Sequence, residues 1–168
     1  DTRVAGVSFT GSRPTARDIS ARVAGSIKRT SFELGGKSAT IIFADAELDR
    51  AVTEAAVAIY STTGQSCVAG SRILVEKSIY DDFLTRFEAE SRRWKIGNPL
   101  DSETMLGPLV SKGQYDRVMG YIDLARSEGR ILFGGGRPPG MEKGFFIEPT
   151  AVVEAPNSTR VCPEEIFG

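Results

Sequence analysis

One of the two cysteines, Cys67, follows a turn of small residues, Thr63-Gly64-Gln65-Ser66, and is the residue best suited to covalent chemistry. The 168 residues include no histidine, which excludes a Cys–His pair, a Ser–His–Asp triad and histidine metal ligation. A nucleophilic Cys67 would need a carboxylate, a lysine, a helix terminus or a bound cofactor as its partner. The alternative is that Cys67 is a small buried hydrophobe, the commonest fate of a free cysteine.

The composition limits the classes of protein to which the chain can belong. Its apolar content of 40% suffices for one sizeable core, or for one core plus the edge of another. The net charge of −1 shows no basic excess, so neither nucleic acid nor an anionic membrane is an expected partner. No apolar run approaches the roughly 18 residues of a membrane span. Two cysteines are too few for a disulfide scaffold, which favours a reducing, cytoplasmic compartment, and we predict no metal site.

The elements that must position Cys67 can be predicted from the apolar periodicity and the turn residues. A strand at 4–9, a turn at 10–12 and a helix that begins near Pro14 and ends at Gly25 come first. A strand, a glycine and a helix N-terminus together form a ready anion site, because unpaired backbone N–H groups face outward there. Only Gly11 is present, however, and many ordinary strand-to-helix turns look the same.

The next elements lead to the cysteine and beyond it. Strands are predicted at 29–34 and 39–43, and then a helix capped by Asp45 that runs to about Tyr60 and delivers the 63–67 turn. A strand at 72–76, a helix opened by Ser78 and an ordered loop over 95–110 follow. Ser111 and Gln114 form a capping box for a helix that ends at Gly129, and the last strands are predicted at 131–133, 145–147 and 151–153. This alternation predicts an α/β fold with an open, mostly parallel sheet and flanking helices.

Several of these segments together resemble the aldehyde dehydrogenase superfamily. Phe9-Thr10-Gly11-Ser12 resembles its cofactor turn, Phe32-Glu33-Leu34-Gly35-Gly36-Lys37 its glutamate signature, and Gly64-Gln65-Ser66-Cys67 with Ala69-Gly70-Ser71-Arg72 its cysteine signature. Residues 145–150 and 164–168 resemble two further stretches of the family, and the interval from Glu33 to Cys67 suits it. The resemblance covers nearly the whole chain.

The resemblance implies a role for each matched residue. Cys67 would be the nucleophile and Glu33 the general base that activates water for hydrolysis of a cysteine thioester. Gly11 and Ser12 would lie against the pyrophosphate of NAD or NADP, and Leu34 near its nicotinamide. The implied contacts of the nicotinamide ribose and ring are Glu165 and Phe167. Cys162 has no family motif around it and is interpreted as structural.

The resemblance also implies a domain organisation and an activity. Residues 1–32 would be the C-terminal edge of an NAD(P)-binding domain, and 33–168 a catalytic domain incomplete at both ends. The parent protein would oxidise an aldehyde to a carboxylic acid and would be a homodimer or homotetramer, whereas the isolated fragment would be inactive. Two alternatives remain: a coenzyme A-acylating aldehyde dehydrogenase, and a non-catalytic domain that retains the fold. We also expect Cys67 in a cleft at the C-terminal side of the sheet, with Glu33 facing the same cleft.

Overall fold

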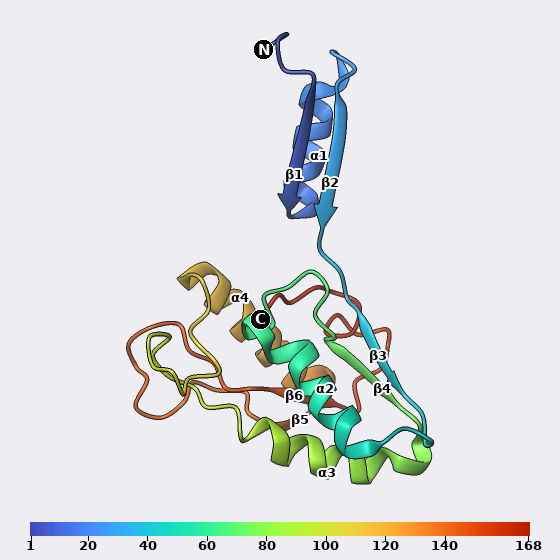
Figure 1. The fold of residues 1–168 in the computed structure, drawn as a ribbon, viewed down its shortest axis with the longest axis vertical. Coiled ribbons are helices and arrows are strands. Elements are labelled where there is room, and N and C mark those ends of the chain that lie inside the picture. The colour runs from blue at the N-terminus through green and yellow to red at the C-terminus, as the bar shows by residue number, and fades with distance from the viewer. The chain divides into compact units, whose positions relative to one another are not determined.

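The computed structural model describes residues 1–168 and divides into two compact units, Asp1–Gly36 and Lys37–Gly168 (Figure 1). The domain boundary between residues 32 and 33 of the parent enzyme stays a prediction. None of the helices is both long and apolar enough to cross a membrane.

The first unit is a strand–helix–strand motif. Strand β1 (Gly6–Gly11) pairs in parallel with β2 (Arg29–Leu34), and helix α1 (Arg13–Ala24) connects them. Helix α1 begins where the sequence indicates, because Ser12 is its N-cap and a proline occupies its first turn. The register pairs Gly11 with Leu34 and Thr10 with Glu33, so the ends of both strands lie together.

The second unit begins with another parallel pair. Strands β3 (Ala39–Ile42) and β4 (Arg72–Val75) are joined by helix α2 (Leu48–Tyr60), which packs against α3 (Tyr80–Ser91). The main core lies around α2 and α3. Its members are Ile42, Val52, Ala55, Ala56, Tyr60, Phe83, Phe87, Trp94, Leu106 and Phe133. The apolar periodicity that predicts α2 gives a face of Leu48, Val52, Ala55, Ala56 and Ile59, and the structure packs this face into the core.

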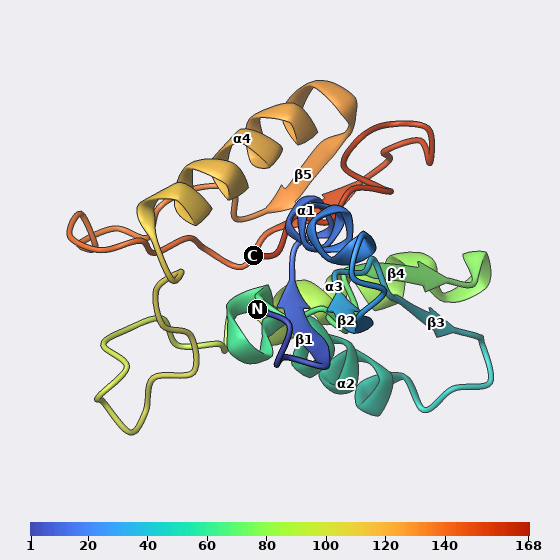
Figure 2. The ribbon, with the colours of Figure 1, turned by 90° about the horizontal axis from the view of Figure 1, so that it is seen from above.

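Helix α4 (Lys112–Glu128) lies beside strand β5 (Arg130–Phe133), which pairs antiparallel with β6 (Ala151–Val153) (Figures 1 and 2). A second, smaller core of Leu109, Val118 and Ile122 forms under α4. It is completed by partly buried side chains from the end of the chain, including Phe145, Ile147 and Ile166. Leu109, from the loop between α3 and α4, thus shares this core with α4 and with Ile166 near the end of the chain.

The predicted α/β class is confirmed, with parallel pairing in two of the three sheets. The strands form three separate pairs, however, and the pair β5–β6 is antiparallel. A parallel neighbour needs a crossover connection, usually a helix, and the glycine-rich segment between β5 and β6 contains none. The strand predicted at 145–147 is wrong: this segment is a loop, in which the Phe145 carbonyl accepts a bond from the Leu109 N–H.

Two predicted helix caps are also wrong. Helix α2 begins after Glu47, whose side chain makes no capping bond, and not after Asp45. Ser78 lies in a short 3₁₀ turn that precedes α3, and its hydroxyl donates to the Glu76 carboxylate at 2.8 Å. In both places a suitable residue type lies one or two positions too early, which the apolar periodicity cannot resolve.

Candidate active site

The loop that carries Cys67 leaves the end of α2 through a strained turn. Thr62 and Thr63 adopt left-handed backbone conformations with φ of 60° and 55°, and Gly64 follows with φ of 71°. A left-handed conformation costs a residue with a side chain roughly 1–2 kcal/mol, and such strain persists only where the surroundings fix it. Strained backbone of this kind clusters at functional sites.

Gln65 fixes this turn from within. Its amide nitrogen donates to the Thr63 hydroxyl at 2.5 Å, and its amide oxygen accepts from the Val110 N–H at 3.0 Å. The side chain thus ties the loop to the segment that leads into α4. Because Gln65 lies two residues before Cys67, this anchor sets the course of the backbone that presents the thiol.

The backbone after Cys67 is equally constrained. The Gly70 N–H donates to the Ala58 carbonyl at 2.9 Å, and a Cβ on Gly70 would lie 2.6 Å from the Thr40 hydroxyl oxygen. A larger residue at this position would require the Thr40 side chain in β3 to move. Cys67 itself is exposed. The interpretation of Cys67 as a buried hydrophobe is therefore wrong, and the thiol is accessible to a small molecule.

The expectation that Cys67 lies at the C-terminal side of its sheet is also wrong for the strands of its own unit. Helix α2 carries the chain from the C-terminal end of β3 back to the N-terminal end of β4. Cys67 follows α2 and precedes Arg72, the first residue of β4, so it lies at the N-terminal ends of these strands.

Four of the predicted site residues gather in the first unit. Gly11 and Leu34 are register partners at the C-terminal end of β1–β2, and the exposed Glu33 is adjacent. Ser12 caps α1, and its hydroxyl oxygen accepts from the Thr15 N–H at 3.4 Å. The site thus combines a strand end, a glycine and the start of a 12-residue helix, an arrangement that suits a phosphate group. Glu33 and Cys67 belong to different units, and their approach stays a prediction.

The two remaining site residues, Glu165 and Phe167, lie in the C-terminal segment, which packs against the cysteine loop. A Cβ on Gly64 would lie 2.9 Å from the carbonyl carbon of Gly168, so these two backbones are in contact. Phe167 has a left-handed φ of 66° and is 37% exposed. The thiol loop and the segment predicted to contact the nicotinamide are therefore neighbours.

Comparison with known proteins identifies the family to which the chain belongs. The sequence model of the aldehyde dehydrogenase family matches residues 1–168. The chain belongs to this family.

Its similarity to individual family members is high along its whole length. It is 42% identical to a betaine aldehyde dehydrogenase of Mesorhizobium japonicum over 98% of this chain and 34% of that protein. It is 44% identical to a chloroplastic aminoaldehyde dehydrogenase of Arabidopsis thaliana, over 96% of this chain and 32% of that protein. The crystal structure of betaine aldehyde dehydrogenase from Staphylococcus aureus in complex with NAD⁺ superposes with a TM-score of 0.96 at 39% identity, covering 99% of this chain and 34% of that one. The chain thus spans about a third of the length of these relatives.

Lys37 is partly buried and lies near Cys162, Glu164 and Glu165. Burial lowers the pKa of the Lys37 ammonium, while the nearby Cys162 and Glu165 act in the opposite direction. The thiol of Cys162 donates to the Ala155 carbonyl at 3.7 Å and accepts from the Thr159 hydroxyl at 3.8 Å. These local bonds agree with a structural Cys162.

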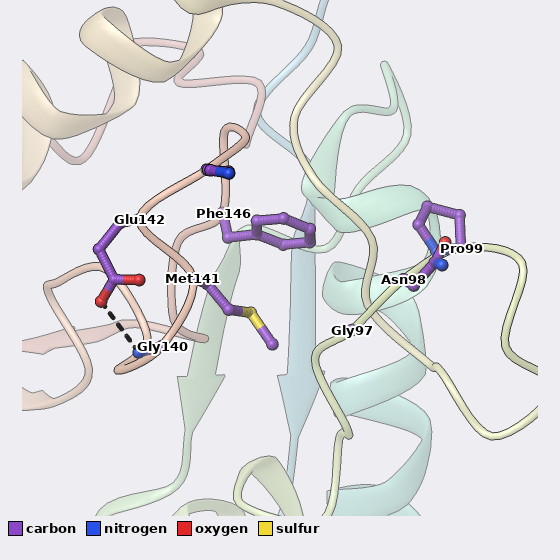
Figure 3. A pocket seen from close by; sticks show the side chains of 8 residues that line it. Gly97, Asn98, Pro99, Gly140, Met141, Glu142 and Phe146 are labelled. Atoms are coloured by element: carbon purple, nitrogen blue, oxygen red, sulfur yellow. Dashed lines mark hydrogen bonds between the residues drawn. The ribbon is translucent and has the colours of Figure 1, made fainter.

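Family motifs do not account for every notable feature. Two loops, Gly97–Pro99 and Gly140–Lys143, line a cavity of about 540 Å³ together with Phe146. The side chains of Met141 and Phe146 extend toward the opposite loop (Figure 3). None of the predicted site residues lines this cavity. The described residues also include no group of three Cys, Asp or Glu side chains that could hold a metal ion.

Sequence reasoning missed one set of contacts at the site. Ser111 caps α4 as predicted, and its hydroxyl accepts from the Gln114 N–H at 3.2 Å. The Gln114 side chain, however, does not complete the capping box by returning to Ser111. It donates to the carbonyls of Ile166 and Phe167, at 3.1 and 2.6 Å. The spacing of Ser111 and Gln114 identifies the cap, but no local pattern identifies partners 52 and 53 residues away.

Proposed function

We propose that this chain is the part of an NAD-dependent aldehyde dehydrogenase that contains the nucleophile, the general base and the nicotinamide end of the cofactor site. The observation that carries the proposal is the contact of the Gly64 and Gly168 backbones, which joins the loop of the exposed Cys67 to the Glu165–Phe167 segment. The names of the relatives support an aldehyde substrate, and the NAD⁺ complex of the Staphylococcus aureus enzyme supports NAD.

In the proposed reaction, Cys67 and Glu33 act in sequence. The thiolate of Cys67 adds to the aldehyde carbonyl carbon and forms a tetrahedral thiohemiacetal. NAD⁺, when bound, supplies the acceptor for the hydride that leaves this carbon, so the aldehyde is oxidised by two electrons to a thioester of Cys67. Glu33 then takes a proton from water, the water oxygen attacks the thioester carbonyl, and the carbon–sulfur bond breaks to release the carboxylic acid. A carboxylate base suits a chain that has no histidine.

The residues proposed for the cofactor fit the group that they would hold. Gly11, Ser12 and the first turn of α1 provide backbone N–H groups for a pyrophosphate. A Cβ on Gly11 would lie 2.6 Å from the tip of the Phe9 ring, so a larger residue at this position would require that ring to move. Leu34, Glu165 and Phe167 would complete the site at the nicotinamide.

Glu33 favours hydrolysis over the coenzyme A-acylating alternative, because attack by a thiol needs no such base. An exposed cysteine on a strained loop favours an enzyme over a non-catalytic domain, because packing requires neither feature. We further propose that the parent protein is a cytoplasmic homodimer or homotetramer, as the family resemblance and the low cysteine content indicate.

The test uses a full-length enzyme that contains this segment. Cys67→Ala should abolish both aldehyde oxidation and the cofactor-independent hydrolysis of p-nitrophenyl acetate, whereas the matched control Cys162→Ala should retain both. Glu33→Gln should still be acylated, and mass spectrometry should then find the acyl group on Cys67. Equal activities of the two cysteine variants would show that the nucleophile is misassigned.

A further inference from the structure

The cavity between residues 97–99 and 140–143 takes no part in the proposed reaction, because none of the residues proposed for that reaction lines it. Its volume of about 540 Å³ falls within the range of roughly 300–1,000 Å³ that is typical of sites for small molecules. Met141 and Phe146 extend from one side of the cavity toward Asn98 and Pro99 on the other (Figure 3). The cavity is therefore a separate candidate for a binding site.

Arg137 fixes one wall of this cavity. Its Nη1 atom donates to the carbonyls of Met141, Glu142 and Gly144, at 2.9, 2.9 and 2.7 Å. The guanidinium also lies over the Tyr115 ring of α4, 4.8 Å from the ring centroid, where a cation–π interaction adds to the hydrogen bonds. The loop 140–144 is thus held through its backbone, and the Met141 side chain is left to face the cavity.

The opposite wall is fixed by short-range bonds of its own backbone. The Gly97 N–H donates to the Leu106 carbonyl at 3.0 Å, and the Asp101 N–H donates to the Asn98 carbonyl at 2.9 Å. The Asn98 side-chain oxygen accepts from the Leu100 N–H at 3.0 Å. Because both walls are ordered by bonds that involve no ligand, the cavity is preformed, and a ligand does not have to order either loop in order to bind.

The inner surface of the cavity is largely apolar. Met141 and Phe146 are only partly buried, so they keep apolar surface that a ligand would cover. The Phe146 ring lies against the backbone of its own loop, since a Cβ on Gly144 would lie 2.7 Å from it. A methionine adapts its shape to the group that it contacts, and the face of an aromatic ring accepts an apolar chain or a second ring. These side chains, with Pro99 opposite, suit the apolar body of a small molecule.

The polar groups of the cavity suit an anion. The Lys143 ammonium makes no ion pair and no hydrogen bond with the rest of the chain. The Asn98 carboxamide accepts from Leu100 through its oxygen, which leaves its NH₂ group as a second donor. The one carboxylate in the lining, that of Glu142, is already bonded to the Gly140 N–H at 3.2 Å (Figure 3). The side-chain groups that lack a partner are therefore donors, and one of them is a cation.

We propose that this cavity binds a carboxylate with an apolar body. The apolar body packs on Met141, Phe146 and Pro99, and the carboxylate pairs with Lys143 and accepts from the Asn98 amide. The site goes beyond the proposed function and does not depend on it, because it shares no residue with the proposed active site.

The experiment uses a full-length enzyme that contains this segment and three probes that separate charge from apolar body. Octanoate has both, 1-octanol has the body alone, and acetate has the charge alone. Calorimetric titration should give a dissociation constant of about 1 mM or below for octanoate, at least fivefold weaker binding of 1-octanol, and no detectable binding of acetate. Hydrogen–deuterium exchange should slow in peptides that cover residues 97–99 and 137–146 when octanoate is present.

A charge reversal at Lys143 tests the pairing directly. Lys143→Glu should weaken octanoate binding about tenfold or more and should create binding of octylammonium, because the sign of the charge at the cavity is inverted. The matched control is Lys77→Glu, which makes the same change at an exposed lysine outside the cavity and should bind octanoate as wild type does. Both variants should oxidise aldehyde at the wild-type rate, which shows that the fold and the active site are intact.

Four outcomes would overturn the proposal. Equal binding of octanoate and 1-octanol, or unchanged octanoate binding in Lys143→Glu, would show that the cavity does not recognise a carboxylate. Slowed exchange confined to peptides around Cys67 would place octanoate in the active site alone. A wild-type enzyme that does not bind octanoate would show that the cavity is closed or filled in the full-length protein. None of these results bears on the proposed function, which the Cys67 and Cys162 variants test separately.

Discussion

Tyr60, the last residue of α2, and Ser91, the last residue of α3, form a buried pair of hydroxyl groups. Removing the Ser91 hydroxyl should cost more stability than removing the Tyr60 hydroxyl. Tyr60 and Ser91 are 6% and 2% exposed, and their side-chain oxygens are 2.9 Å apart. The Ser91 hydroxyl donates its one proton to the Phe87 carbonyl at 2.7 Å, so the Tyr60 hydroxyl must be the donor to Ser91. Tyr60 immediately precedes the strained turn that leads to Cys67.

The two single variants should therefore differ. Ser91→Ala leaves the Tyr60 donor unsatisfied between the Phe87 and Trp94 rings, at 6.0 and 5.4 Å between centroids, and should cost about 1–3 kcal/mol. Tyr60→Phe removes the donor while Ser91 keeps its bond to Phe87, and should cost about 0.5–1.5 kcal/mol. The double variant buries no orphaned hydroxyl, so its cost should be well below the sum of the single costs.

The assay is hydrogen–deuterium exchange of α2 and α3 peptides in the full-length enzyme, which gives the local free energy of opening. Burial raises the pKa of Tyr60 to about 12. Because the phenol of an unfolded chain ionises near pH 10, this group stabilises the fold fully below about pH 10, and the contribution is lost as the pH rises toward 12. The loss should reach about 2–3 kcal/mol in wild type and be absent in Tyr60→Phe. Additive single variants, or the same alkaline loss in Tyr60→Phe, would refute the assignment of donor and acceptor.

Three further outcomes are expected. Gly64→Ala should destabilise the cysteine loop by about 1–2 kcal/mol and slow ester hydrolysis, because Gly64 has a left-handed φ and lies close to the backbone of Gly168. The control is Gly120→Ala within α4, where a Cβ would meet no other atom within 4 Å. This control should show no destabilisation in the same exchange and ester assays. A hydrogen bond from Arg160 is the main cause that lowers the pKa of Glu164 to about 2, so the anchoring of segment 164–168 is complete above about pH 4.5 and lost as the pH falls toward 2. Hydrogen–deuterium exchange of peptides that cover residues 164–168, measured as a function of pH, should show this loss of anchoring in wild type. Glu164→Gln should show no such dependence on pH. Residues 1–168 alone should bind NAD weakly or not at all and should not oxidise an aldehyde, since hydride transfer needs a positioned cofactor and positioning supplies about 7–11 kcal/mol of the barrier. Micromolar binding by calorimetry, or sustained turnover, would contradict this.

Features that depend on short spacing can be predicted from the amino-acid sequence alone. The apolar positions of α2, the cap at Ser111 and the end of α4 at Gly129 were all predictable, because each depends on contacts within one or two helical turns. The motifs around Glu33 and Cys67 identified the family for the same reason, since each is a contiguous run of residues. The failures at Asp45 and Ser78 were small errors of position at helix starts.

The partners of long-range contacts, in contrast, are set by how the whole chain packs. Residues 145–147 have the composition of a strand, yet Phe145 serves the second core and bonds to Leu109 from a loop. Gln114 has the spacing of a capping residue, yet it donates to carbonyls at the far end of the chain. In each case a local interaction of about 1 kcal/mol competes with several tertiary contacts, and the sum of the tertiary contacts prevails. The left-handed backbone of Phe167 has the same origin, because its carbonyl accepts from Gln114 in α4 and the next residue, Gly168, packs against Val118 and Gly64.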